Sequence, residues 1–139
     1  MSKKQALRLF EKALLVFAVA FAVFAALSVE QPPETEDVAL VIMQWSFAAA
    51  ALGSVAIAHF VAKSEARKSV ASGMSEKQAR IQSRFLRIMA LESILIGNLG
   101  MWMMSGQQWP NAVMAVIPFC FAVAQAVMPI PGADGETES

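Results

Sequence analysis

Four long apolar runs dominate the sequence and limit what the chain can fold into. They cover residues 13–29, 38–62, 88–104 and 111–130. A helix needs about 20 apolar residues to cross the hydrocarbon core of a bilayer, and each run approaches or exceeds that length. Backbone groups surrounded by lipid must be hydrogen-bonded within their own segment, so each run is expected to be helical. The sequence therefore predicts an all-α integral membrane protein, a four-helix transmembrane bundle.

The composition excludes several other classes of protein. A chain of 139 residues with 57% hydrophobic residues cannot hide so much apolar surface inside a water-soluble globule, nor is it a disordered chain. The 11 lysines and arginines are balanced by 11 acids, so the basic excess of a nucleic-acid binder is missing. Cys120 is the single cysteine, which excludes an internal disulfide and a multi-cysteine metal site. We expect its thiol to be buried and inert.

The positions of the basic residues predict the topology. All lysines and arginines fall in residues 1–12 and 63–87, and loops rich in these residues stay in the cytoplasm. The loops at 30–37 and 105–110 are then external, and the even number of spans returns the C-terminus to the cytoplasm. Three tryptophans lie near the predicted outer ends of the spans, where aromatic residues gather at the membrane interface: Trp45, Trp102 and Trp109.

Local signals set the expected ends of the two central helices. Gly73 is a natural stop for the second helix. Ser75 followed by Gln78 fits an N-terminal capping box, so the third helix is expected to start near Glu76 and to run to Met104. Both helices are thereby extended beyond the membrane into the cytoplasm.

Further signals concern the second and fourth spans and the domain limits. Thr35 or Asp37 is positioned to cap the second helix. Pro118 lies in the middle of the fourth run and should kink that helix. Residues 1–131 are expected to form a single four-span transmembrane domain, followed by a disordered acidic tail at 132–139.

The first run has a second interpretation. Its basic start, its apolar stretch and the sequence Ala26-Leu27-Ser28 are also typical of a signal peptide with a small-residue cleavage site. The run is longer than the apolar region of most signal peptides. Cleavage would leave three spans and an external N-terminus, and both interpretations stay open.

Small residues recur at spacings suited to helix packing. The second span contains Ala50, Ser54 and Ala58, and the third contains Ser93 and Gly97. Such residues let helix backbones approach closely where no hydrophobic force drives helices together in lipid. Packing within one chain and packing between copies of the chain are both open interpretations.

Glu92 is the only charged residue inside a predicted span. An ionisable group within a membrane is by default a candidate functional site. His59 in the second span and Gln125 in the fourth fall at a similar depth in the cytoplasmic leaflet, so the three side chains are expected to form an intramembrane polar cluster. Two roles are open for this cluster: a proton relay or cation site, or a polar pin that fixes the register of the helices.

Two further polar residues lie within the spans, Asn98 and Gln44. They are expected to form hydrogen bonds between helices or to line a pathway. The sequence contains no phosphate-binding loop, nucleophile elbow, metal-ligand spacing or pair of catalytic carboxylates. It therefore predicts that the protein is not an enzyme and that it uses neither a metal ion nor a cofactor.

These features favour a small non-enzymatic membrane protein that serves as an accessory or interaction subunit of a membrane complex. Its expected surroundings are the lipid bilayer and either a membrane-protein partner or further copies of the chain, without nucleic acid. The expected location is the bacterial inner (plasma) membrane, with both termini in the cytoplasm. The alternative is a small proton- or cation-coupled transporter or channel that uses Glu92.

Overall fold

The computed structural model describes residues 2–29 and 37–128 of the chain. Every regular element in these two ranges is helical, and they contain no strand. The helices are α1 (Lys3–Ser28), α2 (Val38–Leu52), α3 (Ser54–Ala71), α4 (Glu76–Ser105), α5 (Asn111–Met114) and α6 (Val116–Val127). The all-α fold class predicted from the sequence is therefore confirmed for this part of the chain.

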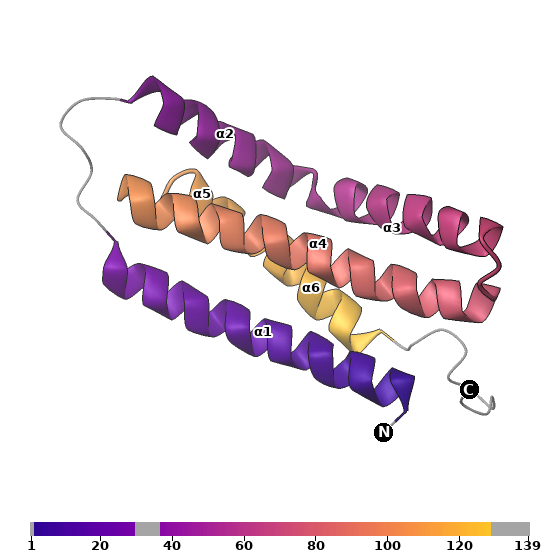
Figure 1. Ribbon diagram of the computed structural model, residues 1–139. Helices are drawn as coiled ribbons and strands as arrows, with labels where there is room; N and C mark the ends of the chain where they lie inside the picture. The colour runs from indigo at the N-terminus through magenta and orange to yellow at the C-terminus, as the bar shows by residue number, and fades with distance from the viewer. Residues whose placement is uncertain (1, 30–36, 129–139) are drawn as a thin grey trace.

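Helix α4 lies at the centre of the bundle and packs against each of the other helices. In Figure 1 it runs between α1 on one side and the α2–α3 pair on the other, with α6 behind it. One buried cluster joins α1, α4 and the start of α6 at Ala18, Ala25, Leu95, Leu99 and Ala115. A second cluster joins α3, α4 and α6 at Ala58, Ile88, Leu91 and Ala122. Many of the small residues thus pack within one chain, and their use between copies stays a prediction.

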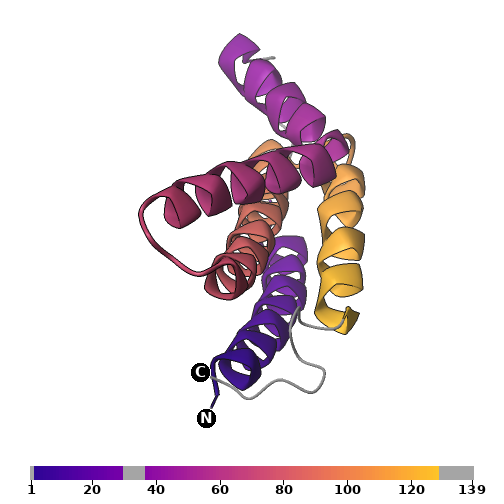
Figure 2. The same cartoon turned by 90° about the vertical axis from the view of Figure 1, so that its right-hand side faces the viewer.

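The second predicted span is broken rather than continuous. α2 ends at Leu52 and α3 begins at Ser54, and the pair is bent by 71° at this break, as Figure 2 shows. Gly53 lies between them. Glycine costs a helix about 1 kcal/mol relative to alanine, so the chain can leave helical geometry there at little cost. The expectation of one uninterrupted helix over 38–62 is wrong for this reason.

The turn between α3 and α4 follows the sequence signals closely. α3 ends at Ala71, and Gly73 follows with a φ of 108°, a backbone conformation that favours glycine. The hydroxyl oxygen of Ser75 accepts a 3.2 Å hydrogen bond from the backbone N–H of Gln78, and α4 begins at the next residue, Glu76. The predicted start of the longest helix is confirmed, and its observed end lies one residue beyond the predicted one.

The fourth predicted span consists of two helices. α5 ends at Met114 and α6 begins at Val116, so the interruption lies one turn before Pro118. Proline has no N–H to donate to the carbonyl oxygen four residues earlier, and its ring crowds that carbonyl. Cys120 on α6 is exposed, so the expectation that its thiol is buried is wrong. It lies on the side of α6 away from the fully buried Ala122.

In the part of the chain that the structure describes, two helices are long and apolar enough to cross a membrane, Lys4–Ser28 and Glu76–Ser105, and the bent pair α2–α3 would make a third. The fourth predicted span corresponds to a shorter apolar stretch, Asn111–Val127. These helices support a membrane protein in general. α1 starts well before the run expected from residue 13, so most of the basic N-terminal segment is helical too. The predicted tail at 132–139 lies outside the described residues.

Candidate functional site

A buried ion pair joins the N-terminal helix to the central helix. The guanidinium group of Arg84 on α4 donates hydrogen bonds of 2.9 Å to both carboxylate oxygens of Glu11 on α1. The two side chains are only 4% and 1% exposed. Planar, bidentate pairing of this kind is the strongest form of arginine–carboxylate contact. Because both charges are buried, removing either partner would leave the other charge without compensation.

Gln125 of α6 hydrogen-bonds to both members of this ion pair. Its side-chain amide donates 2.9 Å hydrogen bonds to the Glu11 carboxylate and to the backbone carbonyl of Arg84. Its own backbone carbonyl accepts a 2.6 Å hydrogen bond from the Arg84 guanidinium. These contacts, defined here as the α1–α4–α6 clamp, fix one end of the bundle through three helices.

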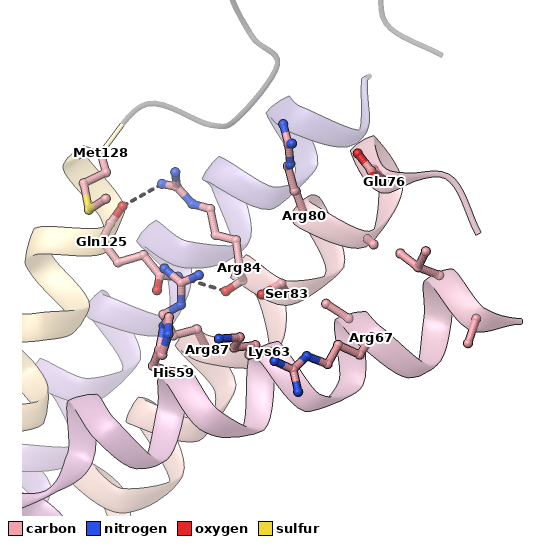
Figure 3. A pocket seen from close by; sticks show the side chains of 14 residues that line it. His59, Lys63, Arg67, Glu76, Arg80, Ser83, Arg84, Arg87, Gln125 and Met128 are labelled. Atoms are coloured by element: carbon pink, nitrogen blue, oxygen red, sulfur yellow. Dashed lines mark hydrogen bonds between the residues drawn. The ribbon is translucent and has the colours of Figure 1, made fainter. Parts of the chain in front are cut away.

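An open groove of about 790 Å³ lies beside the clamp, between α3, α4 and the end of α6 (Figure 3). Six of its lining residues carry a basic side chain: His59, Lys63 and Arg67 of α3, and Arg80, Arg84 and Arg87 of α4. We call this the cationic groove. Glu76 is the one acidic residue among the described residues of its lining. The other lining residues are the polar Ser83 and Gln125 and the apolar Ala66, Val70, Ala71, Ala79 and Met128.

Helical spacing explains why the basic residues meet in the groove. Residues 59, 63 and 67 follow one another at intervals of four, and residues 80, 84 and 87 at intervals of four and three. Such intervals place side chains on one face of a helix. The turn after α3 folds α3 back along α4, so the two basic faces are brought to one groove (Figure 3).

Within the described residues, most of the groove cations have no acidic partner. Arg84 is paired with Glu11. In the described part of the chain, Lys63, Arg67, Arg80 and Arg87 take part in no side-chain hydrogen bond or ion pair, and the Nε atom of Arg87 is a buried donor without an acceptor. Like charges that line one groove repel one another, and an anion in the groove would reduce this repulsion.

The three residues of the predicted polar cluster have different surroundings in the structure. His59 and Gln125 both line the cationic groove, whereas Glu92 is not part of its lining. Glu92 is 6% exposed on α4, and neither of its carboxylate oxygens has a hydrogen-bond partner within the described residues. The roles proposed for these three residues stay predictions.

A second polar layer lies toward the opposite end of α4. The side-chain amide of Asn98 donates a 3.0 Å hydrogen bond to the backbone carbonyl of Phe47 on α2. Asn111 donates 2.9 Å hydrogen bonds to the side-chain oxygen of Asn98 and to the backbone carbonyl of Gln44. Gln44 enters this layer through its backbone, and its side-chain nitrogen has no partner within the described residues. The layer ties α2 and α5 to α4.

Three residues of these networks are not predicted from the sequence: Glu11, Arg84 and Asn111. For Glu11 a signal existed, because it lies seven residues before Ala18 and fourteen before Ala25 on the buried face of α1. Seven residues make close to two helical turns, so a carboxylate on that stripe must be buried as well.

The side chains of the cationic groove are suited to binding an anion. Within residues 2–29 and 37–128 there is no group of three or more histidine, cysteine or acidic side chains that could hold a metal ion. The cationic groove offers hydrogen-bond donors and positive charge, which suit an anionic ligand.

Comparisons of the chain with protein-family models, with curated proteins and with solved structures find no match.

Proposed function

We propose that the protein is a non-enzymatic accessory or interaction subunit of a membrane complex, and that the cationic groove holds an anionic group of its binding partner. The observation that carries the proposal is the convergence of Lys63, Arg67, Arg80 and Arg87 on one open groove without acidic partners in the described residues. The proposed architecture is the four-span bundle in a bacterial inner membrane, with both termini in the cytoplasm.

The arrangement of the helix ends supports this topology. The start of α1, the turn between α3 and α4 and the end of α6 lie toward the same end of the bundle (Figure 1). Trp45 and Trp109, both expected at the outer face, pack edge to face with ring centroids 6.2 Å apart. The position of the lysine- and arginine-rich segments at one end agrees with the positive-inside rule, and the tryptophan pair agrees with an aromatic belt.

Labelling of single cysteines tests the topology. In a Cys120→Ser background, a cysteine at Ser72 in the α3–α4 turn should be labelled by a membrane-impermeant thiol reagent only after spheroplasts are opened. A cysteine at Gln107, in the opposite loop, should be labelled in intact spheroplasts. The reverse pattern would contradict the proposed orientation.

The groove offers more than the topology rule requires. That rule accounts for the number of positive charges near the cytoplasmic face, but it sets no geometry for them. Here cations from two helices face one concavity whose volume lies within the range of about 300–1,000 Å³ that is usual for binding sites. An anionic segment or headgroup of a partner would relieve the repulsion between these charges.

A site-specific photocrosslinker tests the interaction role. Val70 lines the groove and is partly exposed, so a photoreactive residue placed there should give one discrete adduct in native membranes. The adduct should be lost when Lys63→Glu and Arg67→Glu are introduced. The matched control carries the photoreactive residue at Lys68, which is exposed on the same helix outside the groove lining. Equal adducts from both positions would contradict the proposal.

Proton- or cation-coupled transport is the second candidate, and the state of Glu92 favours it. A buried carboxylate without a hydrogen-bond partner in the described residues is costly to keep, which is a common mark of ionisable groups on transport pathways. Flux in proteoliposomes tests this role. Loss of proton or cation flux in Glu92→Gln, at equal reconstitution, would support transport, and equal flux from both proteins would remove Glu92 from it.

A further inference from the structure

We propose that the cationic groove is a phosphate-binding site, and that its ligand is the phosphate of an anionic phospholipid headgroup or a free phosphate group. This inference rests on the proposed function in one respect, because it takes the groove to be the place where an anion is held. It goes further by naming the chemistry of that anion.

The donor set suits phosphate. Arg67, Arg80 and Arg87 line the groove together with Lys63, and each guanidinium presents a planar fork of donors that matches two oxygens of a tetrahedral anion. A carboxylate offers two oxygens in one plane, whereas phosphate presents oxygens in several directions. In Figure 3, Lys63 and Arg67 of α3 lie beside Arg87 of α4, whereas Arg80 extends away from α3. A phosphate bound between Lys63, Arg67 and Arg87 would therefore be contacted from both helices.

The clamp keeps these donors available. Within the described residues, Arg84 is the one groove arginine that an acid engages, and its bidentate bond to Glu11 occupies that carboxylate. Glu76 lies at the N-terminal end of α4, at the far end of the groove from Gln125 (Figure 3). Between them, the described residues of the lining carry cations and no further carboxylate. Neutralising such a group of charges from outside is more favourable than leaving them to repel one another.

The apolar part of the wall points to an amphiphilic source. Val70 and Met128 line the groove beside the cations, with three alanines. Phospholipids present a phosphate next to apolar carbon, and anionic headgroups gather juxtamembrane lysines and arginines at the cytoplasmic leaflet. The same donors would also accept inorganic phosphate, so the two sources are separated by experiment.

Binding to the purified full chain in a neutral detergent tests the proposal. The probes are short-chain phosphatidylglycerol, short-chain phosphatidylcholine at the same acyl length, and inorganic phosphate alone, each titrated by calorimetry. The groove variant is Lys63→Gln/Arg67→Gln, in which both substituted residues are exposed and lie outside the clamp. The matched control is Lys12→Gln/Lys68→Gln, which removes the same charge from exposed positions outside the groove lining.

We expect saturable binding of phosphatidylglycerol that weakens by at least about tenfold in the groove variant, the effect of losing one charge-assisted hydrogen bond. The control should change by less than about twofold, because only screened surface charge is removed. If inorganic phosphate also binds and its binding also weakens in the groove variant, the site takes free phosphate as well. If it does not bind, the site requires the lipid.

Three results would overturn the inference. They are equal weakening in the two variants, equal binding of phosphatidylcholine, and no binding of either anionic probe to a wild-type chain whose thermal unfolding shows it to be folded. Where the double variant does not fold, the single variant Lys63→Gln replaces it. A groove-dependent crosslinked adduct without phosphate binding would remove this inference alone, whereas phosphate binding without any adduct would remove the interaction role alone.

Discussion

The guanidinium group of Arg84 donates two 2.9 Å hydrogen bonds to the carboxylate of Glu11, which lies 73 residues earlier in the chain. The contact ties the first helix to the central helix at the end of the bundle where the cationic groove lies. It also gives α6 its anchor, because Gln125 hydrogen-bonds to both residues. The groove therefore has one wall that is held in place by a buried network rather than by apolar packing alone.

Breaking this ion pair should destabilise the bundle strongly. In Glu11→Ala the Arg84 guanidinium would stay buried without its counter-charge, and the expected loss is about 3–5 kcal/mol in the free energy of unfolding. Denaturant titration in a mild detergent, followed by circular dichroism, measures this loss. A change below about 1 kcal/mol would show that the pair is not buried in solution.

A surface pair provides the control. Glu65 and Lys68 form an ion pair of 3.4 Å on α3, with side chains that are 45% and 71% exposed. Glu65→Ala should cost less than about 1 kcal/mol, because water screens the pair. The double variant Glu11→Leu/Arg84→Met should recover much of the loss seen in Glu11→Ala, since apolar residues of similar size remove the uncompensated charge.

The amide of Asn98 should contribute measurably to the packing of α2 and α5 on α4. Asn98→Ala removes its hydrogen bonds to Phe47 and Asn111, and the expected cost is about 1–2 kcal/mol in unfolding free energy. Ser93→Ala is the matched control on the same helix, because the Ser93 hydroxyl is exposed and bonds only the carbonyl of Met89 in its own helix. Equal effects of the two substitutions would argue against the interhelical role.

Two glycines of α4 should respond with opposite signs to the same substitution. A Cβ atom at Gly97 would lie 2.5 Å from the ring of Phe47, whereas one at Gly100 would meet nothing within 4 Å. Gly97→Ala is therefore expected to destabilise the protein by about 1–3 kcal/mol through overpacking. Gly100→Ala should stabilise it by about 0.5–1 kcal/mol, because alanine is the better helix former. Thermal unfolding midpoints of the two variants give the test.

If Gly97→Ala destabilises the protein through the Phe47 ring, Phe47→Leu in the same chain should restore part of the lost stability. Failure of this rescue, together with a loss in Gly100→Ala, would show that α2 and α4 do not pack as described.

The apolar runs, together with the residues that favour turns and helix caps, made the helices predictable from the sequence. Gly73 and Ser75 mark the turn before α4 because a positive φ and a side-chain cap are local properties of those residues. The break at Gly53 was not predicted, because one glycine in an apolar run is as compatible with a straight helix as with a bend of 71°. Only packing against α4 decides between them.

The site was less predictable because it depends on pairings between distant residues. The seven lysines and arginines in residues 63–87 are equally compatible with a topology signal and with the lining of a groove. Their spacing produces a groove only once α3 lies along α4. Glu11 stands among basic residues at the start of the chain, where a charge is ordinarily solvated. Its spacing of seven residues from Ala18 places it on the buried face of α1, but its pairing with Arg84 and Gln125 depends on the tertiary fold and is specified by no local pattern.

The buried carboxylate of Glu92 should lower stability rather than support it. Both of its oxygens lack a hydrogen-bond partner within the described residues although the side chain is 6% exposed. Keeping a polar group buried without partners costs about 1–3 kcal/mol, so Glu92→Leu is expected to raise the free energy of unfolding by an amount of that order. Ser93→Leu, at the exposed neighbouring position, should change it by less than about 0.5 kcal/mol. Denaturant titration of both variants in the same detergent measures the difference. A loss of stability in Glu92→Leu alone would identify the carboxylate as a structural pin, whereas a gain in stability would mean that a costly group is retained for something other than the fold.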